Sequence, residues 1–151
     1  MKKTIWWDMD GTIADLYAVN EWLEKLQAHD ATPYAEAEVM WNMSKLARLM
    51  NQAQRAGYKL GVISWLSKCP TPEFDQAVIE AKLAWLKLHL KSVQFDEIHI
   101  VAHGFPKHSF MNTENDILFD DEEGNRTAWL GEAYEPDMMI KVLKALLGKE
   151  W

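Results

Sequence analysis

The sequence contains little cysteine, little positive charge and no long apolar run, and each shortage excludes a class of protein. Cys69 is the single cysteine in 151 residues, which excludes an intramolecular disulfide and a cysteine-rich zinc site. The formal net charge is −7, and a chain without a basic stripe is not expected to bind extended nucleic acid. No apolar run approaches the length of a transmembrane helix, and Met1-Lys2-Lys3 does not lead into the apolar core of a signal peptide. We therefore expect a cytoplasmic protein that does not interact with membranes.

The composition is typical of a globular protein. Apolar residues make up 48% of the chain and charged residues 26%, which argues against disorder. A chain of this length can bury a substantial core, and the sequence contains no internal repeat, low-complexity segment or interdomain linker. We therefore predict a single domain that spans residues 1–151.

Strands alternate with helices along the predicted fold. Runs of β-branched and aromatic residues predict strands, and apolar residues at helical spacing predict helices. The predicted strands are Lys3–Trp7, Tyr58–Trp65, Glu97–Val101, Asp116–Phe119 and a short one at 131–134. The predicted helices are Leu16–Gln27, Glu36–Ala56, Pro72–Lys91 and Pro136–Leu147, with a break at Ala28–Tyr34. This alternation predicts a three-layer, Rossmann-like α/β fold, in which helices cover both faces of a parallel sheet.

Two helical segments of this fold matter for function. The segment between the first two strands holds more helix than a single crossover needs, so residues 16–40 are predicted to form a small helical lid. The long helix after the second strand begins with Thr71 as its N-cap and Pro72 at its first position. Its predicted apolar face consists of Phe74, Val78, Ala81, Trp85 and Leu88.

Two carboxylates, Asp8 and Asp10, follow directly after the first predicted strand. Because side chains alternate along an extended chain, both carboxylates leave the backbone on the same side. Such a pair repels itself unless a positive charge lies nearby, and a hard divalent cation fits that requirement. Gly11 then allows a sharp turn. The alternative interpretation is an ordinary acidic turn, because Asp-Gly is a common turn pair.

Three further strand ends also carry polar side chains. Ser64 lies at the end of the second strand, Lys107 follows the third, and Asp120 and Asp121 follow the fourth. Taken singly, these groups fit a turn serine, a solvated lysine and an acidic helix N-terminus. The carboxyl ends of parallel strands meet at one edge of the sheet, where ligands bind. Together with Asp8 and Asp10, these four side chains supply the parts of a phosphoryl-transfer site.

The sequence at these strand ends resembles the haloacid dehalogenase superfamily, specifically its phosphatase branch. The matching residues are Asp8-Met9-Asp10-Gly11-Thr12 for the first motif, Ser64 after Gly61-Val62-Ile63 for the second, Lys107 for the third, and Asp120-Asp121 after Ile117-Leu118-Phe119 for the fourth. The predicted lid lies where this family inserts its type 1 cap. The sequence is also similar to the small 5′-nucleotidase-like members of the family.

The resemblance implies a Mg²⁺-dependent phosphatase that forms an aspartyl-phosphate intermediate. Asp8 would be the nucleophile, and Asp10 would protonate the leaving oxygen and then activate water. Mg²⁺ would be held by Asp8, by the backbone carbonyl of Asp10 and by Asp120, with Asp121 behind them. A carboxylate at the position of Asp10 favours a phosphatase over the transport ATPases of the family, which carry threonine there.

The resemblance also assigns the groups that would hold the substrate. Ser64 and Thr12 would hydrogen-bond the phosphoryl oxygens, while Lys107 would offset the charge that accumulates on them. Trp65 either stacks on a base of the substrate or packs beneath the lid, and we favour packing.

Two further details stay open at the level of sequence. His103 and His108 flank Lys107 and form an alternative metal or acid–base set, but they lack a third ligand at suitable spacing, so surface positions are expected. Arg126 either orients Asp121 or compensates local negative charge.

The favoured interpretation is a phosphatase for a small phosphorylated metabolite such as a nucleotide, acting as a monomer or homodimer. The alternatives are a phosphatase for a polynucleotide end and a non-catalytic phosphoryl-binding module on the same fold. A response-regulator receiver fits poorly, because its phosphorylated aspartate ends a later strand and Ser64 ends the second strand here.

Overall fold

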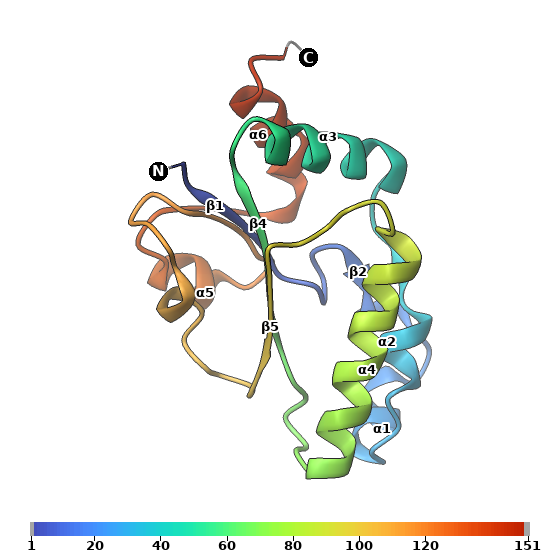
Figure 1. The fold of residues 1–151 in the computed structure, drawn as a ribbon. Helices are drawn as coiled ribbons and strands as arrows, with labels where there is room; N and C mark the ends of the chain where they lie inside the picture. The colour runs from blue at the N-terminus through green and yellow to red at the C-terminus, as the bar shows by residue number, and fades with distance from the viewer. Residues whose placement is uncertain (1, 150–151) are drawn as a thin grey trace.

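A central sheet of five parallel strands confirms the predicted fold class. The computed structural model describes residues 2–149. Met1 and residues 150–151, which the predicted domain includes, lie outside the described residues. The strand order is β5-β4-β1-β6-β7 (Figure 1). The strands are β1 (Thr4–Trp7), β4 (Lys59–Trp65), β5 (Glu97–Val101), β6 (Ile117–Phe119) and β7 (Glu132–Tyr134). All five predicted strands are present, with small changes at their ends.

The central strand β1 is buried on both faces of the sheet, and its side chains alternate between them. Ile5 and Trp7 pack into the larger core cluster with apolar residues of the three long helices. Trp6 points to the opposite face, where it packs with Trp129 and Phe110. A continuous apolar run is therefore what this strand needs, because neither face meets water.

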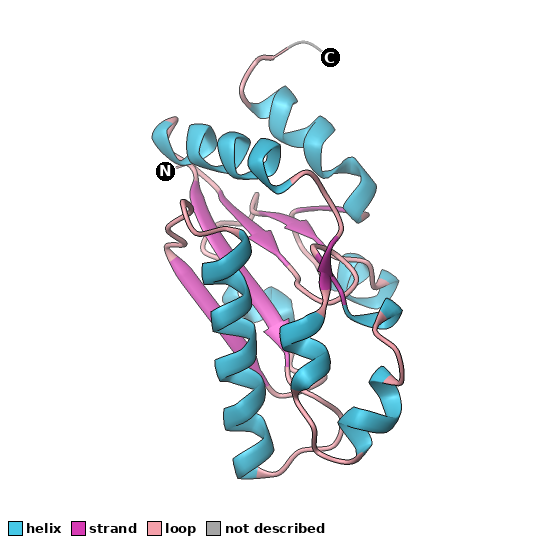
Figure 2. Ribbon diagram, turned by 90° about the vertical axis from the view of Figure 1, so that its right-hand side faces the viewer, coloured by secondary structure: helices cyan, strands magenta, loops and turns pink. Residues whose placement is uncertain are grey.

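Helices cover both faces of the sheet, with the longer ones on one side (Figure 2). The long helices are α3 (Met43–Arg55), α4 (Pro72–His89) and α6 (Met139–Leu146). The opposite face carries only α5 (Glu123–Ala128) and the 3₁₀ turn η2 (Lys107–Phe110). The predicted closing helix begins with a separate 3₁₀ turn, η3 (Pro136–Met138).

The segment between β1 and β4 has a two-stranded stem that the sequence did not predict. Strand β2 (Ala14–Asp15) pairs antiparallel with β3 (Glu38–Val39). Between them lie the 3₁₀ turn η1 (Leu16–Ala18), α1 (Trp22–Gln27) and α2 (Thr32–Glu36). The predicted helix Leu16–Gln27 is therefore wrong in its middle, where Glu21 adopts a left-handed φ of 57°. The predicted break is wrong in part too, because α2 begins inside it.

The spacing of methionine and leucine residues predicted a helix that begins at Glu36, but α3 begins at Met43. Glu36 ends α2 instead, and Glu38 and Val39 are extended because they form one strand of the stem. Asn42 then caps the helix, since its side-chain oxygen accepts a hydrogen bond from the Lys45 amide at 3.1 Å.

Helix α4 begins as predicted, because the Thr71 hydroxyl oxygen accepts a hydrogen bond from the Phe74 amide at 3.1 Å. The predicted apolar face is wrong at its end, since Leu88 is 69% exposed. A lysine occupies the buried stripe instead: Lys82 is only 1% exposed. The first half of α4 also supports the inserted segment. Leu16, Leu26 and Tyr34 pack there against Phe74 and Val78.

Across residues 2–149, no helix combines the length and apolar character needed to cross a membrane.

Candidate active site

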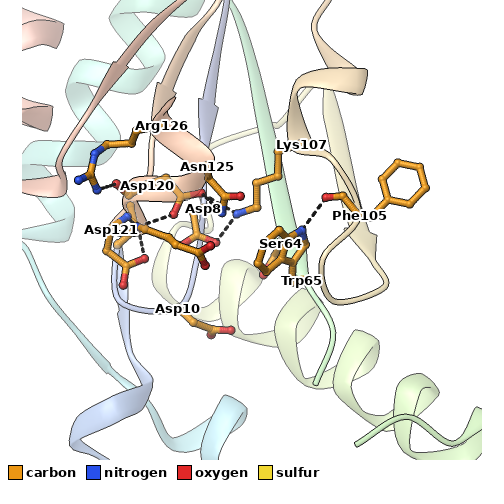
Figure 3. Close-up of polar contacts among 12 residues, drawn as sticks. Asp8, Asp10, Ser64, Trp65, Phe105, Lys107, Asp120, Asp121, Asn125 and Arg126 are labelled. Carbon is orange, nitrogen blue, oxygen red and sulfur yellow. Dashed lines mark hydrogen bonds and ion pairs between the residues drawn. The ribbon is translucent and has the colours of Figure 1, made fainter. Parts of the chain in front are cut away.

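The four predicted strand ends meet at one edge of the sheet (Figure 3). Asp8 follows β1, Ser64 lies near the end of β4, Lys107 opens η2 after β5, and Asp120 follows β6. The parallel strands bring these residues together although they lie far apart in the sequence.

Asp8 is 7% exposed, and both of its carboxylate oxygens accept hydrogen bonds. The Lys107 ammonium donates to Oδ1 at 2.8 Å, and the Thr12 hydroxyl donates to Oδ2 at 3.0 Å. The backbone amide of Asp8 donates to the carbonyl of Phe119 at 2.9 Å, which ties the residue to β6. Asp8 is therefore fixed in position at the end of the central strand.

Lys107 joins two of the site's carboxylates. Its ammonium donates to Asp8 and to Asp120, each at 2.8 Å, and it is only 3% exposed. Burial alone would lower the pKa of Lys107, but the two carboxylates raise it above its usual value. The side chain therefore stays protonated and supplies a fixed positive charge beside Asp8.

Asp120 and Asp121 differ in how firmly they are held. Asp120 is 1% exposed; its Oδ2 also accepts a hydrogen bond from the Asn125 amide group at 3.0 Å, and its Oδ1 accepts one from the Glu122 amide at 3.0 Å. Asp121 is exposed, and its amide donates to the Thr12 hydroxyl oxygen at 3.2 Å. Burial and the nearby charge of Asp8 raise the pKa of Asp120 to about 6 and that of Asp121 to about 8.

These acids fit a hard divalent cation. One carboxylate oxygen from each of Asp8, Asp120 and Asp121 lies within 4.8 Å of the others, and residues 2–149 contain no second group of this kind. Oxygen donors are the ligands that Mg²⁺ prefers. Burial is the main cause of the raised pKa values of Asp120 and Asp121, and the charge of Asp8 adds to it; a bound cation would oppose that part of the shift. The side chain of Asp10 does not belong to this group.

Asp10 is bound to a lysine that the sequence analysis missed. The Lys82 ammonium donates to Oδ2 of Asp10 at 2.9 Å, to the Ser64 hydroxyl oxygen at 2.5 Å and to the Trp65 carbonyl at 2.8 Å. Burial raises the pKa of Asp10 above its usual value, although the charge of Lys82 opposes this shift. One signal in the sequence was available: Lys82 stands four residues after Val78, on the buried stripe of a helix.

Gly11 is required by the backbone and by the site. Its φ of 79° is unfavourable for other residues. A Cβ atom at this position would lie 2.3 Å from the Asp121 carboxylate oxygen Oδ2. The predicted turn after the acid pair is therefore confirmed, and it also makes room for Asp121.

The residues that the sequence left open have definite places. Trp65 lines the cavity, but its indole N–H donates to the Phe105 carbonyl at 2.9 Å, so the ring is held by the protein. His103 lies beside the Trp65 ring, with ring centroids 4.7 Å apart. Arg126 donates to the backbone carbonyl of Asp120 at 3.0 Å, so it orients that residue rather than the side chain of Asp121. Neither His103 nor His108 joins the acidic group of potential metal ligands.

A cavity of about 540 Å³ opens above the acids. Its floor contains the strand-end residues Asp8, Asp10, Lys107, Asp120 and Asp121, whereas Ser64 lies buried beneath it, and the inserted segment forms one wall. That wall contributes Leu16, Tyr17, Trp22, Leu23, Leu26 and Tyr34. The cavity therefore joins a charged floor to an apolar, aromatic wall.

The parallel sheet, with its acid pair directly after the central strand, is similar in fold to a solved phosphatase structure. That structure is D,D-heptose 1,7-bisphosphate phosphatase from Burkholderia thailandensis. The TM-score is 0.54 and the sequence identity 18%, over 87% of this chain and 75% of that chain. No family model matches the sequence, and no curated protein matches it. The predicted resemblance is therefore confirmed as a fold.

Proposed function

We propose that the protein is a Mg²⁺-dependent phosphatase that hydrolyses the phosphomonoester of a small metabolite. The observation that carries this proposal is the setting of Asp8. Its buried carboxylate lies between the Lys107 ammonium and the Thr12 hydroxyl, beside two further acids and on the floor of a cavity. A nucleophile, a fixed cation and a set of oxygen ligands are what phosphoryl transfer through an aspartate requires.

The reaction would proceed in two steps. An Asp8 oxygen attacks phosphorus, the bond from phosphorus to the leaving oxygen breaks, and Asp10 transfers its proton to that oxygen. A water molecule then attacks the phosphorus of the aspartyl-phosphate and gives a proton to Asp10. The bond between phosphorus and the Asp8 oxygen breaks, so inorganic phosphate is released and the Asp8 carboxylate is restored. Burial supports the role of Asp10, because it raises the pKa of this carboxyl and so favours its protonated form.

The other polar groups would stabilise the phosphoryl group. Lys107 already offsets the charge of Asp8 at 2.8 Å and lies close enough to act on the phosphoryl oxygens as they gain charge. Ser64 is fully buried beside Lys82, the lysine that binds Asp10. It would donate its hydroxyl hydrogen to one of the phosphoryl oxygens. The Thr12 hydroxyl already donates its hydrogen to Asp8 at 3.0 Å, so we assign Thr12 to holding the nucleophile rather than to the phosphoryl group.

Mg²⁺ would neutralise charge between the nucleophile and the phosphate when bound. Asp8 and the backbone carbonyl of Asp10 would hold it, together with Asp120. We favour Asp120 over Asp121 as the direct ligand because its hydrogen bonds to Lys107, Asn125 and the Glu122 amide already fix its orientation.

The cavity supports a small substrate. Its volume of about 540 Å³ falls in the usual range for small-molecule sites, roughly 300–1,000 Å³. The aromatic wall suits a planar organic group such as a nucleobase. We propose that the inserted segment acts as a lid over this substrate, that the protein works in the cytoplasm, and that it is a monomer or homodimer.

The direct test is hydrolysis of p-nitrophenyl phosphate with and without Mg²⁺, for the unmodified protein and for Asp8→Asn. We expect turnover that requires Mg²⁺, and a loss of more than about 10³-fold in kcat for Asp8→Asn. The matched control is Asp137→Asn, which makes the same change at an exposed position outside the cavity and should keep full activity. Turnover that survives in Asp8→Asn would contradict the assigned nucleophile. A panel of nucleotides and sugar phosphates then identifies the substrate class.

A further inference from the structure

Lys82 is a buried ammonium that the reaction as described so far does not use. It lies on the inner stripe of α4 and is 1% exposed. A buried charge is costly unless it is fully paired. Lys82 meets that condition through Asp10, Ser64, the Trp65 carbonyl and the ring of Tyr34, whose centroid lies 4.8 Å from the ammonium.

The packing of α4 does not require a lysine here. The neighbouring positions on the same stripe, Val78 and Trp85, are apolar and buried. An apolar side chain at position 82 would fill the same kind of site without any desolvation of charge. The contacts of Lys82 are instead concentrated on polar groups at the edge of the candidate active site.

The contact with Ser64 sets the direction of its hydroxyl hydrogen. Lys82 is a donor only, so the Ser64 oxygen must accept this hydrogen bond at 2.5 Å. The hydroxyl hydrogen is then available for another acceptor. Ser64 is fully buried and lies directly before Trp65, which lines the cavity, so a phosphoryl oxygen bound deep in the cavity would be such an acceptor.

The contact with Asp10 fixes one of its two carboxylate oxygens. Lys82 binds Oδ2 at 2.9 Å, so Oδ1 is the oxygen that can carry a proton toward the leaving group. Asp10 lines the cavity, whereas Lys82 does not. Lys82 therefore acts on the substrate only through other residues.

We propose that Lys82 is a positioning residue for the phosphatase reaction, because it holds Asp10 and Ser64 together in the orientation that proton transfer to the leaving oxygen requires. This inference rests on the proposed function. It separates the two buried lysines: Lys107 contacts Asp8 and Asp120 on the metal side, and Lys82 contacts Asp10 and Ser64 on the leaving-group side.

The test uses Lys82→Met in the full-length protein and compares esters that differ in their leaving group. An alkyl phosphate needs a proton on its leaving oxygen, whereas p-nitrophenyl phosphate needs it far less. If Lys82 positions Asp10, kcat/KM for the alkyl phosphate should fall about 10²-fold, with a loss of less than about fivefold for p-nitrophenyl phosphate. Asp10→Asn should give the same selective loss, and the double variant should show no additional dependence on the leaving group.

Lys87→Met is the matched control, since it makes the same change at an exposed position of the same helix. It should keep the leaving-group dependence of the unmodified protein. Lys82→Gln serves as the second variant and keeps an N–H donor without the charge. It should recover part of the alkyl phosphate activity.

Each outcome decides the inference. An equal loss on both esters would show that Lys82 acts on general structure or charge, and would overturn the proposal. Thermal unfolding measures whether the two Lys82 variants fold. If neither folds, the role of Lys82 is structural and the proposal is overturned. If the unmodified protein hydrolyses no ester with Mg²⁺, the proposed function itself is wrong and the role of Lys82 is lost with it. If the unmodified protein is active but Lys82→Met loses activity equally on both esters, the role of Lys82 is contradicted and the proposed function stands.

Discussion

The floor and the wall of the cavity are built on different principles. The floor consists of buried charged side chains, such as Asp8, Lys107 and Asp120, that are fixed by hydrogen bonds of 2.8–3.0 Å. The wall consists of apolar and aromatic side chains from the inserted segment, and several are exposed, such as Tyr17 at 51% and Leu23 at 46%. The difference fits the proposed function, in which the sheet edge would carry the chemistry and the insertion would select the substrate.

If the floor carries the chemistry, substitutions at the floor should have the largest effect on kcat. Replacement of Lys107 by Met removes the positive charge between Asp8 and Asp120, so kcat should fall by about 10²- to 10³-fold. Steady-state kinetics on the best ester of the panel would measure this loss.

The matched variant is Lys68→Met, because Lys68 lines the same cavity but is not part of the Asp8–Lys107–Asp120 cluster. It should change kcat by less than about threefold. Similar losses in the two variants would indicate that only the overall charge of the cavity matters.

A smaller effect is expected where the floor binds the metal. Asp120→Asn should raise the Mg²⁺ concentration for half-maximal activity by about 100-fold, and Asp121→Asn by about tenfold. The reason is that Asp120 is buried and oriented, whereas Asp121 is exposed. Titration of each variant with Mg²⁺ at constant pH measures the two shifts, and the reverse order would make Asp121 the direct ligand.

The smallest effect is expected at the wall. Trp22 lines the cavity from α1 and packs edge-on against Tyr17, with ring centroids 5.0 Å apart. Trp22→Ala should raise KM about tenfold and leave kcat within about twofold, because it removes apolar contact that is equal in the ground state and the transition state. Leu88→Ala changes an exposed apolar residue far from the cavity and should alter neither constant. A large fall in kcat for Trp22→Ala would break the separation between floor and wall.

The sequence predicted the floor better than the wall, and the reason is physical. Strands β1, β4 and β6 are largely buried runs whose pattern is local, and a polar residue at the end of such a run is visible without knowledge of the fold. The position of Ser64, Lys107 and the acids at one edge then follows from the parallel sheet. The stem of the insertion depends instead on distant contacts, such as the hydrogen bond of 2.7 Å from the Trp41 indole to the Thr12 carbonyl.

Lys82 was missed for a related reason. A lysine within a helix is usually solvated, and only the tertiary fold shows that this one meets Asp10, Ser64 and the Trp65 carbonyl. The extension of the apolar stripe to Leu88 failed because Leu88 lies on the exposed side of α4, where it is 69% exposed, while its neighbours Leu86 and Leu90 are buried. Periodicity identifies a helix face but does not show what that face contacts.

The stem formed by β2 and β3 also makes the insertion exchangeable. Because Ala14 pairs with Val39 and Asp15 with Glu38, the two ends of the insertion are held side by side by backbone pairing, independently of how its helices pack. Loop-closure entropy grows only slowly with loop length, so the stem can close a shorter or longer segment at similar cost. A segment grafted between Asp15 and Glu38 would therefore meet the same anchored ends. The stem thus offers a natural junction at which protein engineering can change the substrate range while the sequence from Asp8 to Thr12 stays untouched.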